Sequence, residues 1–218
     1  MSVSPADRRN FDLSAALQEA EERFRAANPK SEAAFAAASR SMPGGNTRTV
    51  LFYPPYPLAL AGGDACYVTD IDGHRYTDFV TEQTAGLYGH SDPRIKAAVS
   101  EALEGGITLG GPTTKEAQLA DLLTQRFPAL DLVRFTNSGT EANLLALQTA
   151  RAVTKRNSVM VFEGSYHGSV LSFGPYGREM NVPMTWVMGS YNNVDDTAEM
   201  IRECAKDLAA VIVEPMTG

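Results

Sequence analysis

From Asp131 onward, short apolar runs alternate with amphipathic helical patterns, and this alternation constrains the fold more than any other feature of the sequence. Four runs are predicted as strands, at 132–136, 159–162, 186–188 and 209–213. Two helices are predicted between them, over 138–154 and 195–207. The runs at 159–162 and 209–213 are entirely apolar, as is typical of strands buried on both faces of a parallel sheet. The pattern therefore predicts an α/β fold with an open, mostly parallel sheet and flanking helices.

The part of the chain before Asp131 has a different pattern. Helices are predicted over 12–27, 31–40, 92–104 and 113–127, the last with Thr113 and Glu116 as a capping box. Segment 66–80 is predicted to be a hairpin that turns at Asp72-Gly73. Segment 51–60 contains three prolines and is predicted to be extended on a surface. We expect residues 1–65 to form a helical and extended part of a small domain, and residues 66–218 to begin a larger domain.

The last predicted strand is followed only by Glu214-Pro215-Met216-Thr217-Gly218. A sheet that ended there would keep an open edge, which folded proteins usually cover. We therefore expect the large domain to be incomplete at its C-terminus, and the sequence to be the N-terminal half of a longer protein.

Charge and composition exclude several classes of function. The chain has 19 basic and 26 acidic residues, so its net charge of −7 gives no electrostatic reason to expect nucleic acid or an anionic membrane as partner. It has neither a run of ~18 apolar residues nor an apolar signal core near its N-terminus. Its two cysteines, Cys66 and Cys204, lie far apart in the sequence. A cytoplasmic protein with two free thiols is expected.

The segment at 135–143 contains the residues most typical of a ligand site. A predicted strand ends there, and a helix begins at once. The first turn of a helix has unpaired N–H groups and a partial positive charge, and Ser138, Gly139 and Thr140 add two hydroxyls and an accessible backbone. These features favour a bound phosphate. In the alternative interpretation, Ser138 and Glu141 form only a capping box.

Two more predicted strands end in polar or aromatic residues, Tyr166 and His167 after the first and Glu214 after the second. Ligands of open parallel sheets bind beyond the carboxyl ends of the strands, so these residues are expected near Ser138. Tyr166 could stack on a flat heteroaromatic ring or only cover the surface. Glu214 could orient cofactor-binding groups or only cap a helix. His167 has no second metal ligand nearby in the sequence, so no metal site is predicted.

Together these motifs resemble those of the class III, fold-type I aminotransferases, which use pyridoxal 5′-phosphate (PLP). The matching segments are 70–73, 89–93, 138–143, 164–168 and 213–215. Within the family, Pro43-Gly44-Gly45 is similar to the glutamate-1-semialdehyde 2,1-aminomutases. Segments 42–52 and 84–90 are more similar to β-amino-acid aminotransferases such as β-phenylalanine aminotransferase, the subgroup that we favour.

The resemblance implies roles for particular residues. Ser138, Gly139 and Thr140 would bind the PLP phosphate. Tyr166 would stack on the pyridine ring with His167 beside it, and Glu214 would belong to the pocket wall. Arg48 would bind the substrate carboxylate, because a guanidinium matches a carboxylate with two parallel hydrogen bonds; the alternative is a solvent-exposed loop charge.

PLP chemistry also needs a lysine that forms the Schiff base and an acid that pairs with the pyridinium nitrogen. In the family both follow the Glu-Pro strand. The chain has lysines at 30, 96, 115, 155 and 206, and none lies in a matching context. We therefore expect no catalytic residue in this chain and place the Schiff-base lysine beyond Gly218. Glu82-Gln83 also departs from the β-phenylalanine subgroup, which often has an aromatic residue after the acid.

The resemblance thus implies that the full-length parent is a homodimeric aminotransferase that transfers an amino group from an amino acid to a keto acid. The 218-residue chain alone is expected to be inactive. The aminomutase reaction, which moves the amino group within one molecule, is one alternative. A non-catalytic fragment without the Schiff-base lysine is the other.

Overall fold

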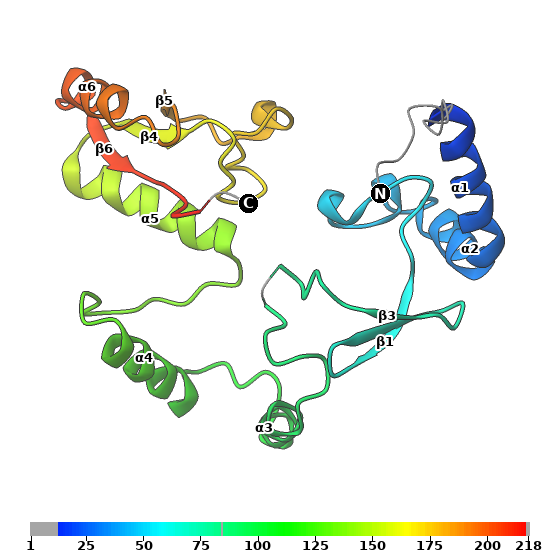
Figure 1. Cartoon of the computed structure of the whole chain (residues 1–218). Helices are drawn as coiled ribbons and strands as arrows, with labels where there is room; N and C mark the ends of the chain where they lie inside the picture. The colour runs from blue at the N-terminus through cyan, green and yellow to red at the C-terminus, as the bar shows by residue number, and fades with distance from the viewer. Residues whose placement is uncertain (1–12, 84, 217–218) are drawn as a thin grey trace, which may run out of the picture. The chain divides into compact units, whose positions relative to one another are not determined.

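The computed structural model describes residues 13–83 and 85–216 (Figure 1). The chain divides into two compact units, Met1–Gly110 and Gly111–Gly218. The boundary expected near residue 65, which concerns the domains of the whole protein, stays a prediction.

The C-terminal unit contains a parallel three-stranded sheet with the strand order β5-β4-β6. Its strands are β4 (Ser158–Phe162), β5 (Thr185–Gly189) and β6 (Leu208–Val211). Its helices are α4 (Thr114–Arg126), α5 (Gly139–Thr154) and α6 (Val194–Cys204). The central strand β4 pairs in parallel with both neighbours, and all five of its residues are buried. The predicted parallel α/β sheet is confirmed.

The core of this unit forms where α5 meets the sheet. Leu147 of α5 is buried with Val159 and Val161 of β4, which lie on the same face of the strand because they are two residues apart. Phe173, from the chain after β4, is also buried and meets the Trp186 ring edge-to-face at 4.9 Å between centroids. This packing fixes the first turn of α5 relative to the end of β4.

Two expectations for the C-terminal unit are wrong. Residues 132–136 have no regular secondary structure and pair with no described strand, and Leu132 remains 91% exposed. A short apolar run becomes a strand only where a neighbour pairs with it. Thr113 precedes α4, but its hydroxyl makes no capping bond. Because Thr113 and Glu116 are both exposed, water can satisfy the free N–H groups there.

The N-terminal unit combines helices with a small antiparallel sheet. Its helices are α1 (Leu13–Ala27), α2 (Pro29–Ala38) and α3 (Pro93–Glu104), and its sheet has the order β1-β2-β3. The strands are β1 (Leu60–Asp64), β2 (Tyr67–Asp70) and β3 (Arg75–Thr77), and two 3-10 turns cover Pro43–Gly45 and Thr49–Leu51. The predicted hairpin is confirmed as β2-β3. Strand β1 was not predicted, because Gly62 and Gly63 give it a weak strand pattern.

The hairpin turn is bound to α2. The carboxylate of Asp72 accepts hydrogen bonds from the backbone N–H groups of Lys30 and Ser31, at 2.8 and 3.0 Å, and from the Ser31 hydroxyl at 2.8 Å. This carboxylate therefore caps the first turn of α2 from a position 41 residues along the chain.

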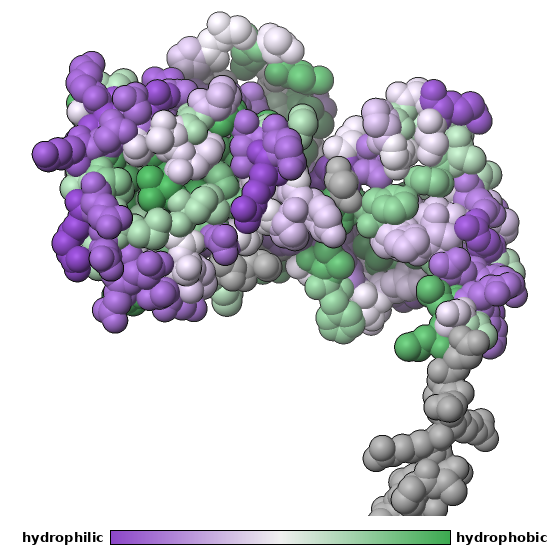
Figure 2. All heavy atoms as spheres, turned by 90° about the horizontal axis from the view of Figure 1, so that it is seen from above, coloured by the Kyte–Doolittle hydropathy of each residue, from purple (hydrophilic) through white to green (hydrophobic). Residues whose placement is uncertain are grey.

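Many large apolar side chains stay exposed in both units, among them Leu13, Phe79, Leu132 and Met216. Figure 2 shows such apolar surface in green between polar side chains. Among the described residues, no helix is both long and apolar enough to cross a membrane.

Candidate functional site

The N-terminus of α5 forms the centre of the candidate site. The Ser138 hydroxyl accepts a hydrogen bond from the Glu141 N–H at 3.1 Å, and the Glu141 carboxylate accepts one from the Asn137 N–H at 2.9 Å. This reciprocal arrangement confirms the predicted capping box. The N–H groups of Gly139 and Thr140 have no acceptor among the described residues, and a side chain added at Gly139 would meet no atom within 4 Å. The helix therefore presents free donors to open space, where its dipole favours an anion.

The loop after β4 packs against this helix end. The Thr140 hydroxyl accepts a hydrogen bond from the Ser169 N–H at 3.1 Å, and the Asn143 side chain donates one to the His167 carbonyl at 2.8 Å. Gly168 lies so close that an added Cβ would fall 2.3 Å from the Thr140 hydroxyl oxygen. The loop and the first two turns of α5 thus form one tightly fitted surface.

Glu214 binds the same loop from the end of β6. Its carboxylate accepts a hydrogen bond from the Tyr166 N–H at 3.0 Å. The Tyr191 hydroxyl lies 3.1 Å from the Glu214 carbonyl and 2.9 Å from the Pro215 carbonyl, close enough to donate to either oxygen. The Tyr166 side chain remains 55% exposed. Glu214 therefore fixes the backbone of Tyr166 and leaves the aromatic ring free to contact a ligand.

His167 is the buried polar residue of this group. The residue is 7% exposed, and its Nε2 atom has no hydrogen-bond partner among the described residues. Burial lowers the pKa of its imidazole, and the nearby Glu214 carboxylate opposes this effect only partly. The ring is therefore neutral at pH 7. In the part of the chain that the structure describes, no three His, Cys, Asp or Glu side chains are grouped to hold a metal ion.

The sheet topology thus brings the six predicted cofactor-binding residues to one edge of the C-terminal unit. They are Ser138, Gly139, Thr140, Tyr166, His167 and Glu214. The Ser138 and Thr140 hydroxyls each accept a bond from a backbone N–H, and each keeps its own hydrogen to donate to an anion. Free amides, two hydroxyl donors and an exposed aromatic ring suit a ligand with a phosphate and a flat heteroaromatic ring, as PLP has.

Arg48 belongs to the N-terminal unit, so it is not among the residues that the C-terminal unit brings together. Its guanidinium forms an ion pair with the Glu82 carboxylate. Both side chains are about half exposed, at 43% and 53%. Arg48 is thus a partly exposed loop residue that pairs within the chain, and the role toward a substrate carboxylate that the resemblance implies for it stays a prediction.

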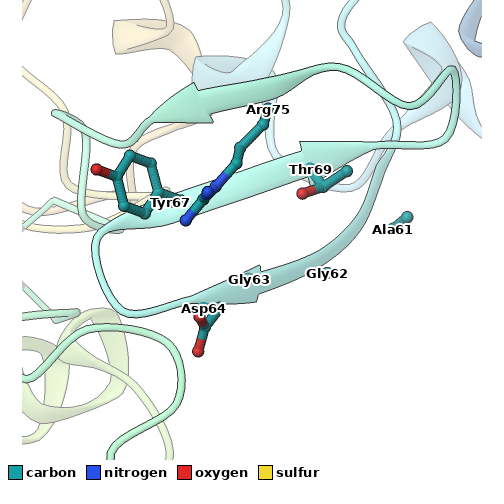
Figure 3. Close-up of a pocket in the computed structure, with 7 residues that line it drawn as sticks. All are labelled: Ala61, Gly62, Gly63, Asp64, Tyr67, Thr69 and Arg75. Atoms are coloured by element: carbon teal, nitrogen blue, oxygen red, sulfur yellow. The ribbon is translucent and has the colours of Figure 1, made fainter.

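The N-terminal unit also has a shallow hollow of about 500 Å³ beside strand β1 (Figure 3). Gly62 and Gly63 are among the residues that line it, and Arg75 lies over the Tyr67 ring with the guanidinium 3.7 Å from the ring centroid. None of the predicted site residues lines this hollow.

Neither Lys155 nor Lys206 lies at the candidate site. Lys155 caps the C-terminus of α5, at the opposite end of the helix from Ser138. Lys206 precedes β6 and so lies at the amino end of that strand, whereas Glu214 follows its carboxyl end. The other three lysines are at positions 30, 96 and 115, in α2, α3 and α4.

Three residues of functional interest were missed by the sequence analysis. Asn143 and Gly168 shape the helix–loop contact, and Glu82 pairs with Arg48. Asn143 lies one helical turn after Thr140, and this spacing on one face was a usable signal. The glycine in the 164–168 motif was another signal, because glycine allows close backbone approach. No sequence signal indicated the pairing of Glu82.

The fold and site define an α/β protein that has, at the carboxyl edge of its parallel sheet, a helix N-terminus with free amides and an exposed tyrosine ring. Residues 53–218 match the family Aminotransferase class-III. The chain belongs to this family and has the fold-type I architecture that the sequence predicted.

Relatives and solved structures agree with this assignment. The chain is 48% identical to the β-phenylalanine transaminase of Variovorax paradoxus over 93% of its own length and 47% of that protein. It is 37% identical to a glutamate-1-semialdehyde 2,1-aminomutase of Methanothermobacter thermautotrophicus, over 87% of this chain and 48% of the relative.

Two solved structures show the same fold. The crystal structure of a β-phenylalanine aminotransferase from Variovorax paradoxus matches with a TM-score of 0.91 at 48% identity, over 94% of this chain and 48% of that one. A transaminase with PLP bound matches with a TM-score of 0.80 at 34% identity, over 87% and 48%. The chain spans about half the length of the curated relatives it matches.

Proposed function

We propose that the whole protein is a PLP-dependent aminotransferase that transfers the amino group of an amino acid, in particular a β-amino acid, to a keto acid such as 2-oxoglutarate. The observation that carries the proposal is the contact between the loop at 164–169 and the N-terminus of α5, which gathers free amides, hydroxyls and an exposed aromatic ring. The similarity to β-phenylalanine transaminase supports the β-amino acid as the substrate class.

Each residue of the candidate site has a defined role in this proposal. The Ser138 and Thr140 hydroxyls, with the amides of Gly139 and Thr140, bind the PLP phosphate and fix the orientation of the ring. Tyr166 stacks on the pyridine ring, and the neutral His167 lies beside it. Glu214 keeps Tyr166 in place through its backbone N–H. When bound, PLP supplies the electron-withdrawing ring that stabilises negative charge at the substrate carbon.

The remaining parts are proposals about the whole protein. We place the lysine that holds the cofactor and moves the substrate proton after residue 218, and with it the acid that pairs with the pyridinium nitrogen. We further propose that the protein is a cytoplasmic homodimer. Arg48 binds the substrate carboxylate through its guanidinium.

The test uses the full-length protein with PLP. Incubation with β-phenylalanine and 2-oxoglutarate is expected to yield glutamate, and omission of 2-oxoglutarate is expected to stop turnover after the bound cofactor is consumed. Conversion of glutamate semialdehyde without a keto acid would instead identify an aminomutase, the alternative that the Methanothermobacter relative favours. A full-length protein that stays colourless with PLP and shows no absorbance change with borohydride would identify a non-catalytic relative.

A further inference from the structure

An unusual turn in the N-terminal unit carries Glu82. Three consecutive residues that are not glycine, Thr81, Glu82 and Gln83, have positive φ angles of 45°, 49° and 52°. This conformation costs L-residues roughly 1–2 kcal/mol each and normally occurs at single positions. Such strain persists only where surrounding contacts impose it, and it is concentrated at functional sites.

The surrounding contacts of this turn are specific. One oxygen of the Asp78 carboxylate accepts hydrogen bonds from the N–H groups of Val80 and Thr81, both at 2.9 Å, and the other lies 2.9 Å from Nε2 of His90. The Gly86 N–H donates to the Thr81 carbonyl at 2.8 Å. The turn is therefore fixed at both ends, and Glu82 projects from a constrained backbone.

This constrained turn presents Glu82 to Arg48, 34 residues away in the sequence. The backbone of Arg48 is itself held, because its N–H donates to the Asn46 side chain at 2.9 Å. The turn also borders a hollow of about 400 Å³ through Thr81, and the exposed side chains of Leu87 and Tyr88 line the same hollow. Neither Arg48 nor Glu82 lines this hollow. The Arg48 guanidinium already pairs with a carboxylate within the chain, and the same fork is suited to the carboxylate of a substrate.

We propose that Glu82 is a specificity-determining residue that occupies Arg48 in the free enzyme, so that a substrate carboxylate must displace it. The inference rests on the proposed function, because it takes Arg48 as the group that binds the substrate carboxylate. Both side chains are half exposed, so the internal pair is weak enough to exchange. The strained turn keeps the Glu82 carboxylate near Arg48, where it competes with a substrate carboxylate for the guanidinium, and amines without a carboxylate are unaffected.

The test uses Glu82→Gln in the full-length enzyme with PLP. Glutamine keeps the size and one acceptor oxygen, so Arg48 stays oriented while the competing charge is lost. The KM for a β-amino acid is expected to fall about twofold to fivefold, the range that corresponds to an exposed ion pair. The kcat is expected to stay unchanged, and so is the KM for an arylalkylamine without a carboxylate.

Three companion variants complete the experiment. Glu19→Gln removes the exposed carboxylate that pairs with Arg23 in α1, and it should change neither KM. Glu82→Asp, which is too short to hold Arg48 in the same way, should act in the same direction as Glu82→Gln. In an Arg48→Ala background, Glu82→Gln should have no further effect on the KM for the β-amino acid.

The two hypotheses fail in different ways. If the wild-type enzyme transaminates β-amino acids but Glu82→Gln and Glu82→Asp leave the KM at the Glu19→Gln value, the inference is overturned and the proposed function stands. An equal change in KM for the amine without a carboxylate would also overturn it. If the wild type transfers no amino group from any donor, the proposed function fails and the inference fails with it.

Discussion

The contact between Gly168 and Thr140 gives the most direct test of the proposed phosphate site. In Gly168→Ala, the new methyl carbon would lie 2.3 Å from the Thr140 hydroxyl oxygen and 2.7 Å from the Thr140 Cα. Such distances are too short for any relaxed contact, and one of the two atoms is backbone. The substitution must therefore displace Thr140, whose amide and hydroxyl are both proposed to bind the phosphate.

Gly164 provides a matched control in the same loop. Gly164 and Gly168 both have positive φ angles, 81° and 136°, but a Cβ at Gly164 would meet no atom within 4 Å. Gly164→Ala should therefore lower the free energy of unfolding by about 1–2 kcal/mol through backbone strain alone. Gly168→Ala carries backbone strain of at least this size and in addition about 1–3 kcal/mol of overpacking.

The overpacking is relieved most directly by moving Thr140, so its energy should appear as lost phosphate binding. A loss of about 1–3 kcal/mol corresponds to a roughly fivefold to hundredfold weaker affinity. The assay is absorbance titration of the cofactor-free full-length protein with pyridoxamine 5′-phosphate, and with pyridoxamine as the phosphate-free comparison. We expect Gly168→Ala to weaken only the phosphate-bearing ligand, and Gly164→Ala to weaken neither by more than about twofold, a difference of roughly 0.4 kcal/mol. Equal affinities of both variants for pyridoxamine 5′-phosphate would refute the proposed role of Thr140.

Two further predictions concern stability. Burial raises the pKa of Asp70, but hydrogen bonds from the backbone and ring of His74, the Tyr76 hydroxyl and the Gly73 N–H outweigh it and lower the pKa to about 2. Asp70 therefore stabilises the folded state above its unfolded pKa of about 4, and this stabilisation should disappear as the pH falls from about 4 to about 2. Asp70→Asn should lower the free energy of unfolding at pH 7 by about 1.5–3 kcal/mol. Urea titrations at several pH values should then show a smaller loss of stability between about pH 4 and about pH 2 than in the wild type. An equal loss of stability in this pH range would contradict the stabilising role of the Asp70 carboxylate. Gln83 has a left-handed backbone conformation that glycine adopts without strain, so Gln83→Gly should raise the free energy of unfolding by about 0.5–1 kcal/mol. As a control, Gln118→Gly inside α4 should lower the free energy of unfolding by about 1 kcal/mol. If Gln83→Gly lowered the free energy of unfolding, the strain assigned to this turn would be contradicted.

The grouping of the proposed cofactor-site residues could be predicted because it follows from topology. Parallel strands place their carboxyl ends at one edge, so residues that follow β4 and β6 must lie near the start of α5. Tyr166 and Glu214 are 48 residues apart, yet their hydrogen bond is a consequence of that rule. What the rule does not give is side-chain detail, such as whether Glu214 would contact the ring or the backbone of Tyr166.

The pairing of Arg48 with Glu82 could not be predicted in the same way. It depends on three left-handed residues, and no glycine or asparagine in the sequence at 81–83 indicates that conformation. The prediction of a strand at 132–136 was wrong for a related reason. The apolar pattern is local, whereas a strand forms only where a neighbouring strand pairs with it. Local patterns therefore predict elements where the sheet supplies partners, and they fail where long-range contacts select the conformation.

Ser138 shows why the sequence alone could not choose between a helix cap and a phosphate ligand. The hydroxyl oxygen accepts the Glu141 N–H, which is the capping function, and its hydrogen remains available as a donor. Thr140 divides its hydroxyl in the same way between the Ser169 N–H and a ligand. The two interpretations use different atoms of the same groups, so they are compatible. The cap holds the first turn of α5 in the geometry in which its free amides can bind an anion.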